Sequence, residues 1–135
     1  MNIGKYIYAK LIATPAIVDQ VSTRVYPVLI GEKVTYPAIA YTVDCVATDK
    51  QKTGVSSHDS ETVTFHIWAD IQQGSNGYEK VGIIDELMRT AFDFTSGTVG
   101  GVIVEHSYYV GSKDIFNEER MLVGREAIYV FITKR

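Results

Sequence analysis

The chain has little of what small proteins use for covalent or metal-based stabilisation. Cys45 is the only cysteine, so no disulfide forms within the chain, and a reducing cytoplasm is the expected setting. The histidines stand apart from one another, and neither an H-E-x-x-H nor a C-x-x-C motif indicates a metal site. No apolar run approaches the roughly 20 residues of a membrane-spanning helix, and no signal peptide is recognisable. We therefore expect a protein that folds in a cytoplasm and does not contact a membrane.

An excess of positive charge and the usual catalytic signatures are missing as well. The 13 basic and 16 acidic residues give a net charge of −3, which argues against a broad surface for duplex DNA or an anionic membrane. The sequence has no P-loop, no G-x-S-x-G elbow and no RNP signature. Serine, histidine and aspartate occur together in residues 56–60, but a catalytic triad depends on geometry rather than adjacency. We expect no catalytic residue and no cofactor, and hence no enzyme.

A strand over residues 61–71 is the clearest element that is present. Its odd positions are apolar and predict a face on the core: Val63, Phe65, Ile67, Ala69 and Ile71. Its even positions, which include His66, Trp68 and Asp70, point to the other face. The strand is therefore expected to have a core on one side only.

An amphipathic helix over residues 78–92 is predicted to follow this strand. Apolar residues recur at spacings of three and four on one face: Tyr78, Val81, Ile84, Leu87, Met88 and Ala91. Charged residues are predicted to face solvent: Glu79, Lys80, Asp85, Glu86 and Arg89. The packing of this helix on the sheet is expected to supply much of the core.

The remaining patterns complete an α+β fold in a single domain of residues 1–135. Two short N-terminal helices are predicted, the second beginning at Pro15 after Thr14 as its N-cap. Further strands are predicted over residues 38–48, with Cys45 buried and inert, and over residues 102–110 and 122–133. Polar connections are predicted over residues 48–60 and 111–120. The simplest closed arrangement is a four-stranded antiparallel sheet of two hairpins, with the long helix packed on it and the short N-terminal helices alongside.

Such a sheet leaves one face bare, and a bare aromatic face usually carries a partner or another subunit. The residues proposed for subunit contacts are Trp68, Tyr109, Tyr129 and Phe131. For Tyr129 and Phe131, ordinary core packing is an equally good interpretation. The residues proposed for a lumen or docking loop are Lys50, Lys52 and His58.

A succession of short motifs resembles one known family. The landmarks are Ile7–Leu11 (IYAKL), Thr23–Pro27 (TRVYP), Tyr36–Tyr41 (YPAIAY), the strand that ends in Trp68-Ala69, the helix after it, and the closing Tyr129–Ile132 (YVFI). In this order they resemble the tail-completion, or tail-terminator, proteins of long-tailed bacteriophages. The likeness extends over nearly the whole chain, except for residues 50–60, where no motif matches.

The resemblance implies an α+β fold and a structural, non-enzymatic role at the head–tail joint of a virion. It implies a ring, usually a hexamer, on the end of the tail tube, which stops tube polymerisation and receives the head connector. The expected partners are other copies of the chain, the tail-tube protein and the head-completion or connector protein, with DNA only passing through the channel. A ring assembled in the host cytoplasm and found in the virion is the expected location.

A second hypothesis from a different class remains open. The α+β layout, with His66 near Trp68 and Asp70, also fits a small cytoplasmic enzyme or ligand-binding domain with a pocket between helix and sheet. Convergence of His66 and Asp70 on such a pocket would favour it.

Overall fold

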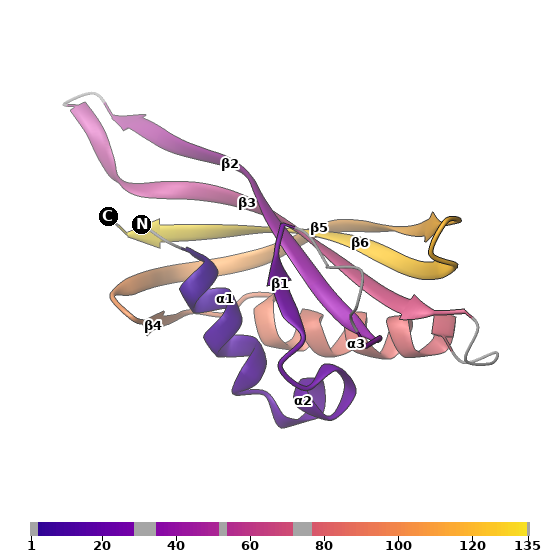
Figure 1. The fold of residues 1–135 in the computed structure, drawn as a ribbon. Helices are drawn as coiled ribbons and strands as arrows, with labels where there is room; N and C mark the ends of the chain where they lie inside the picture. The colour runs from indigo at the N-terminus through magenta and orange to yellow at the C-terminus, as the bar shows by residue number, and fades with distance from the viewer. Residues whose placement is uncertain (1–2, 29–34, 52–53, 72–76, 135) are drawn as a thin grey trace.

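In the described part of the chain, a curved six-stranded half-barrel sheet carries three helices on one of its faces (Figure 1). The computed structural model describes residues 3–28, 35–51, 54–71 and 77–134. The helices are α1 (Ile3–Ile12), α2 (Pro15–Val21) and α3 (Gly77–Phe92). The strands are β1 (Val25–Pro27), β2 (Ala38–Gln51), β3 (Gly54–Asp70), β4 (Gly97–Val99), β5 (Val102–Asn117) and β6 (Leu122–Lys134). We call the face under the helices the inner face and the opposite face the outer face.

The predicted four-stranded antiparallel sheet is wrong. The sheet has the order β1-β2-β3-β6-β5-β4, and β1 runs parallel to β2, so the sheet is mixed. The two expected hairpins, β2–β3 and β5–β6, form its antiparallel centre. The edge strands β1 and β4 have three residues each, which is too short for an alternation of apolar and polar residues to be visible in the sequence.

Both predicted polar connections are also wrong, because the strands continue through them. Strand β2 runs to Gln51 and β3 begins at Gly54, while β5 runs to Asn117 and β6 begins at Leu122. Figure 1 shows the far end of hairpin β2–β3 projecting beyond the helices. Where a strand has solvent on both faces, both registers are polar and no period of two marks it.

The helices begin and end close to where the sequence places them. α2 begins at Pro15 after Thr14, although the Thr14 hydroxyl donates back to the carbonyl of Lys10 at 2.9 Å instead of capping α2. In α3 the predicted core positions Val81, Ile84 and Met88 are buried. No helix in the described residues is long and apolar enough to cross a membrane.

A cluster of aromatic side chains fills the space between the inner face and the helices. Phe92 of α3 stacks on Phe65 of β3 with ring centroids 5.4 Å apart, and it meets Phe131 of β6 edge-on at 5.5 Å. Tyr129 lies edge-on to Phe65 at 5.6 Å, and Tyr6 of α1 meets Phe131 at 6.2 Å. These rings are fully buried, so the inner face has its own complete core within one chain.

A β-bulge at Asp44 changes which face the end of β2 presents. Val43 pairs with Val63, but Cys45 pairs with Thr62, so Asp44 is an extra residue in β2. Both Thr42 and Thr64 donate their hydroxyls to the Asp44 carboxylate. Cys45 is consequently exposed on the outer face, and the prediction that it is buried is wrong.

Candidate functional site

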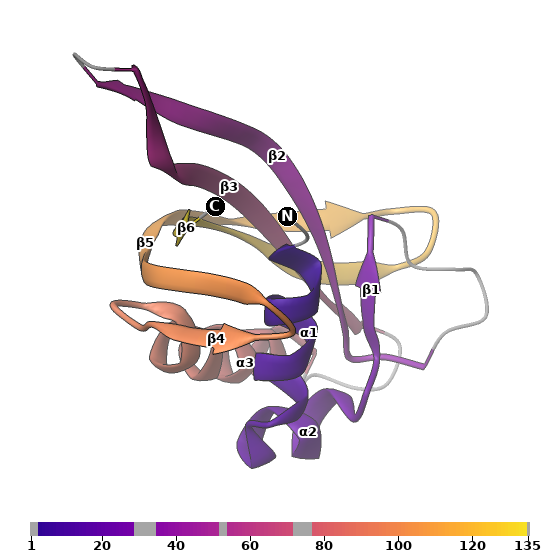
Figure 2. The same cartoon turned by 90° about the vertical axis from the view of Figure 1, so that its left-hand side faces the viewer.

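The outer face of the sheet, which no described helix covers (Figure 2), contains the most distinctive surface feature of the molecule. A cavity of about 390 Å³ opens at the ends of β2, β3 and β6. Its walls combine aromatic, charged and apolar side chains: Val28, Tyr36, Ala40, His66, Trp68, Asn117, Glu119, Arg120 and Leu122. The volume of this cavity and the side chains that line it are suited to receiving one or two side chains of another protein.

Trp68 forms one wall of this cavity, and a glycine on the neighbouring strand leaves space for the Trp68 indole. Trp68 of β3 pairs in register with Gly124 of β6. A Cβ atom on Gly124 would lie 2.7 Å from the Trp68 Cε3 atom and 2.4 Å from the carbonyl oxygen of Ile67. The indole therefore occupies the space that a side chain at position 124 would fill, and it remains half-buried within the single chain.

A row of charges lies beside Trp68 and crosses three strands. The imidazole of His66 stacks on the indole of Trp68, with centroids 6.5 Å apart and planes inclined by 10°. His66 Nε2 lies 3.5 Å from Glu126 Oε1, and Glu126 Oε2 lies 3.2 Å from Lys113 Nζ. The row places the ion pair of Glu126 and Lys113 next to the aromatic rings of His66 and Trp68.

The cavity does not bring together the residues that the enzyme hypothesis requires. His66 and Trp68 line the cavity, whereas Asp70 is not among its lining residues, so the pair that would favour an enzyme does not converge there. The cavity also opens on the outer face and not between helix and sheet, because Ala40, His66 and Trp68 of its lining lie on the outer face. Among the described residues, no group of His, Cys, Asp and Glu side chains is arranged to hold a metal ion.

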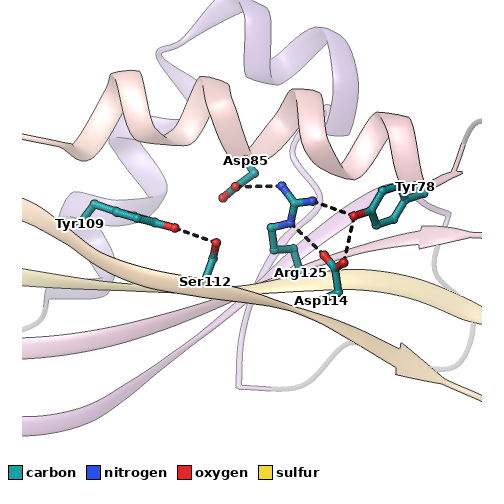
Figure 3. Close-up of polar contacts among 6 residues, drawn as sticks. All are labelled: Tyr78, Asp85, Tyr109, Ser112, Asp114 and Arg125. Carbon is teal, nitrogen blue, oxygen red and sulfur yellow. Dashed lines mark hydrogen bonds and ion pairs between the residues drawn. The ribbon is translucent and has the colours of Figure 1, made fainter.

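A second polar cluster fixes the far half of hairpin β5–β6 to α3 (Figure 3). Arg125 of β6 reaches Asp85 of α3 at 3.2 Å and Asp114 of β5 at 3.2 Å. The Tyr78 hydroxyl donates to Asp114 at 2.9 Å and accepts from Arg125 at 3.4 Å. Asp85 is buried, so the prediction that it faces solvent is wrong, and its charge is balanced by Arg125. This cluster joins the helix layer to the strands that carry the cavity.

The structure places the four aromatic residues proposed for subunit contacts in three different environments. Trp68 is half-buried on the outer face. Tyr109 is half-buried on the inner face, where the Arg89 guanidinium lies 4.0 Å above its ring and its hydroxyl donates to Ser112 at 2.6 Å. Tyr129 and Phe131 are fully buried in the core, as their alternative interpretation expected.

The three residues proposed for a lumen or docking loop lie in or beside the projecting hairpin. Lys50 belongs to β2 and pairs in register with Val55 of β3. His58 belongs to β3, and its Nε2 atom lies 3.5 Å from Glu105 Oε1. Lys52 lies outside the described residues.

Sequence reasoning missed Asp85, Gly124 and Arg125. Asp85 sits among charged helix residues, and its partner is 40 positions away, so no local pattern marks the pair. A glycine within an apolar strand indicates that another group of the protein lies close to the backbone there. Gly124 gave this indication in the sequence, but nothing in the sequence identified the group as the indole of Trp68.

Comparison with known proteins identifies a fold and no sequence family. No family model matches the chain, and a search of curated proteins finds no match. Among solved structures, the fold is similar to a chain of the structure described as "Virion of native gene transfer agent (GTA) particle". That similarity has a TM-score of 0.78 and 13% sequence identity, and it covers 96% of this chain and 92% of the other.

Proposed function

We propose that this chain is a structural protein of a phage-like virion. The observation that carries the proposal is the fold, which nearly the whole chain shares with nearly the whole of a chain in a gene transfer agent virion. A role in assembly also agrees with the outer face, where Trp68 stays half-buried beside a cavity and a row of charges. Such a role needs recognition surfaces and no catalysis.

The more specific proposal is a tail-completion protein. In it, copies of the chain form a ring on the end of the tail tube, and the family resemblance implies six copies. The ring stops tube polymerisation and joins the tube to the head-completion or connector protein, after assembly in the host cytoplasm. The ordered motifs from Thr23–Pro27 to Trp68-Ala69 support this assignment. A net charge of −3 suits a channel through which DNA passes without binding.

Within this function, Trp68 is the proposed anchor for a partner. Buried aromatic anchors in pockets dominate the free energy of protein association. Tyr109 is only half-buried on the inner face, and Tyr129 and Phe131 lie in the core, where they support β6 from inside the chain. The hairpin that contains Lys50 and His58 projects from the body and is proposed to face the lumen or the docking partner.

Native mass spectrometry at micromolar concentration tests the function, with the chain alone and mixed with tail-tube protein. A ring, or a complex with tube protein, is the expected result. A strict monomer that ignores the tube protein would contradict it. Trp68→Ala is expected to weaken the complex about tenfold or more, whereas Phe94→Ala should leave it unchanged, because Phe94 lies on the turn after α3 and does not line the cavity.

A further inference from the structure

Two helices carry stripes of exposed side chains that do not take part in the core of the single chain. On α3 the stripe consists of Glu79, Gly82, Ile83 and Glu86, at the spacing of one helical face. Ile83 is 42% exposed, and both glutamates face solvent. This face lies opposite the buried positions of α3, so packing within the chain does not account for an isoleucine there.

The second stripe lies on α1 and has the opposite charge. It consists of Lys5, Tyr8 and Ile12, again at spacings of three and four. Tyr8 is 39% and Ile12 38% exposed, and Lys5 faces solvent. Within the described residues, neither Lys5 nor the glutamates of the α3 stripe belong to an ion pair.

Gly82 provides an independent indication that something approaches α3 closely. Glycine inside a helix lowers helix stability relative to alanine. A Cβ atom at this position would meet nothing within 4 Å, so no neighbour in the same chain requires the glycine. The absence of a side chain beside exposed Ile83 suits the close approach of another helix.

We propose that the α3 stripe of one copy packs against the α1 stripe of the next copy. Lys5 then pairs with Glu79 or Glu86, and Tyr8 lies over Gly82 and Ile83. The two stripes are different surfaces of the chain, one on α1 and one on α3, so the contact is head-to-tail, which is the kind that can close into a ring. The inference rests on the proposed ring and names its subunit interface.

Charge exchange tests the contact, with native mass spectrometry of the chain alone and with tail-tube protein as the measurement. Lys5→Glu is expected to weaken assembly about tenfold or more, because it sets like charges against each other. Adding Glu79→Lys or Glu86→Lys to Lys5→Glu is expected to restore assembly, and the substitution that does so gives the relative direction of the helices. Lys134→Glu, at an exposed position at the end of β6, changes the net charge by the same amount and in the same direction as Lys5→Glu, and as the control it should leave assembly unchanged.

Disulfide cross-linking provides a second measurement that does not depend on charge. In a Cys45→Ser background, Tyr8→Cys combined with Ile83→Cys is expected to give a ladder of covalent oligomers on oxidation, and each cysteine alone should give none beyond a dimer. Gly82→Leu is expected to block assembly while the thermal melting point of the monomer stays within a few degrees.

The outcomes separate the interface from the proposed function. If the wild type assembles but Lys5→Glu also assembles normally and no ladder forms, the α1–α3 contact is overturned and the ring remains. If the wild type is monomeric in both conditions, the ring and the contact are overturned together.

Discussion

The two faces of strands β3 and β6 differ in how completely the single chain buries their side chains. On the inner face, Phe65 and Phe131 are fully buried against α3 and α1. On the outer face, His66, Trp68 and Glu126 of the same strands remain half-buried. An alternating strand can therefore serve two purposes at once, a core within the chain and a recognition surface outside it. Fold stability should depend on the first face and partner binding on the second.

Substitution of one large aromatic residue on each face tests this division most strongly. Phe131→Ala should lower the free energy of unfolding by about 3–5 kcal/mol, because it removes a buried ring that contacts Phe92 and Tyr6. Trp68→Ala should lower it by only about 1–2 kcal/mol, since the indole is half-buried. Urea unfolding of the two variants provides the measurement. Equal losses would mean that the outer face is part of the core.

The inner face also contains a buried charge pair, whose loss should have the next largest effect. Arg125→Ala leaves the Asp85 carboxylate buried without its partner, and we expect a loss of about 2–3 kcal/mol by urea unfolding. Combining Asp85→Asn with Arg125→Met should recover much of that loss, because no unpaired charge then remains. A double variant no more stable than Arg125→Ala would show that the pair does not act through charge burial.

Sequence reasoning predicted the inner face well and the outer face only in outline. The period of two from Val63 to Ala69 and the spacing of Val81, Ile84 and Met88 placed the core correctly, because a buried face leaves a periodic apolar pattern. The ends of β2 and β3 were not predicted as strand, because their sequence is mostly polar and has no such pattern.

Register changes and long-range pairs were beyond the reach of a single sequence. The extra residue at Asp44 turns Cys45 outward, and only the pairing with Val63 and Thr62 reveals it. The cavity depends in the same way on Gly124 lying beside Trp68, although these residues are far apart in the chain.

Filling the space that Gly124 leaves for the Trp68 indole provides a test confined to the outer face. Gly124→Ala places a Cβ atom 2.4 Å from the carbonyl oxygen of Ile67, so we expect a loss of about 1–3 kcal/mol and a displaced indole. Trp68 is the only tryptophan, so its fluorescence reports the displacement directly. Gly111→Ala is the matched control on β5, where a Cβ atom meets nothing within 4 Å and the spectrum should not change.

The smallest expected effect concerns Glu61, a second buried carboxyl group on the inner face. Glu61 is buried beside Phe131, one of its carboxyl oxygens has no hydrogen-bond partner in the described residues, and burial raises its pKa above the ordinary 4.5. The folded chain therefore holds this proton more tightly than the unfolded chain, and the protonated form stabilises the fold. As the pH rises above about 4.5 and passes through the raised pKa, that stabilisation is lost.

Glu61→Gln removes this titration and should leave the protein about 1 kcal/mol more stable than the wild type at pH 7. The difference should shrink as the pH falls toward 4.5, because protonated glutamic acid and glutamine are then both neutral. Urea unfolding at several pH values measures it, with Glu86→Gln on the exposed face of α3 as a control that should not reproduce the trend. A Glu61→Gln variant that is less stable at pH 7 would show that the inner face accepts a charge at this position. The contrast between the two faces would then be one of packing and not of polarity.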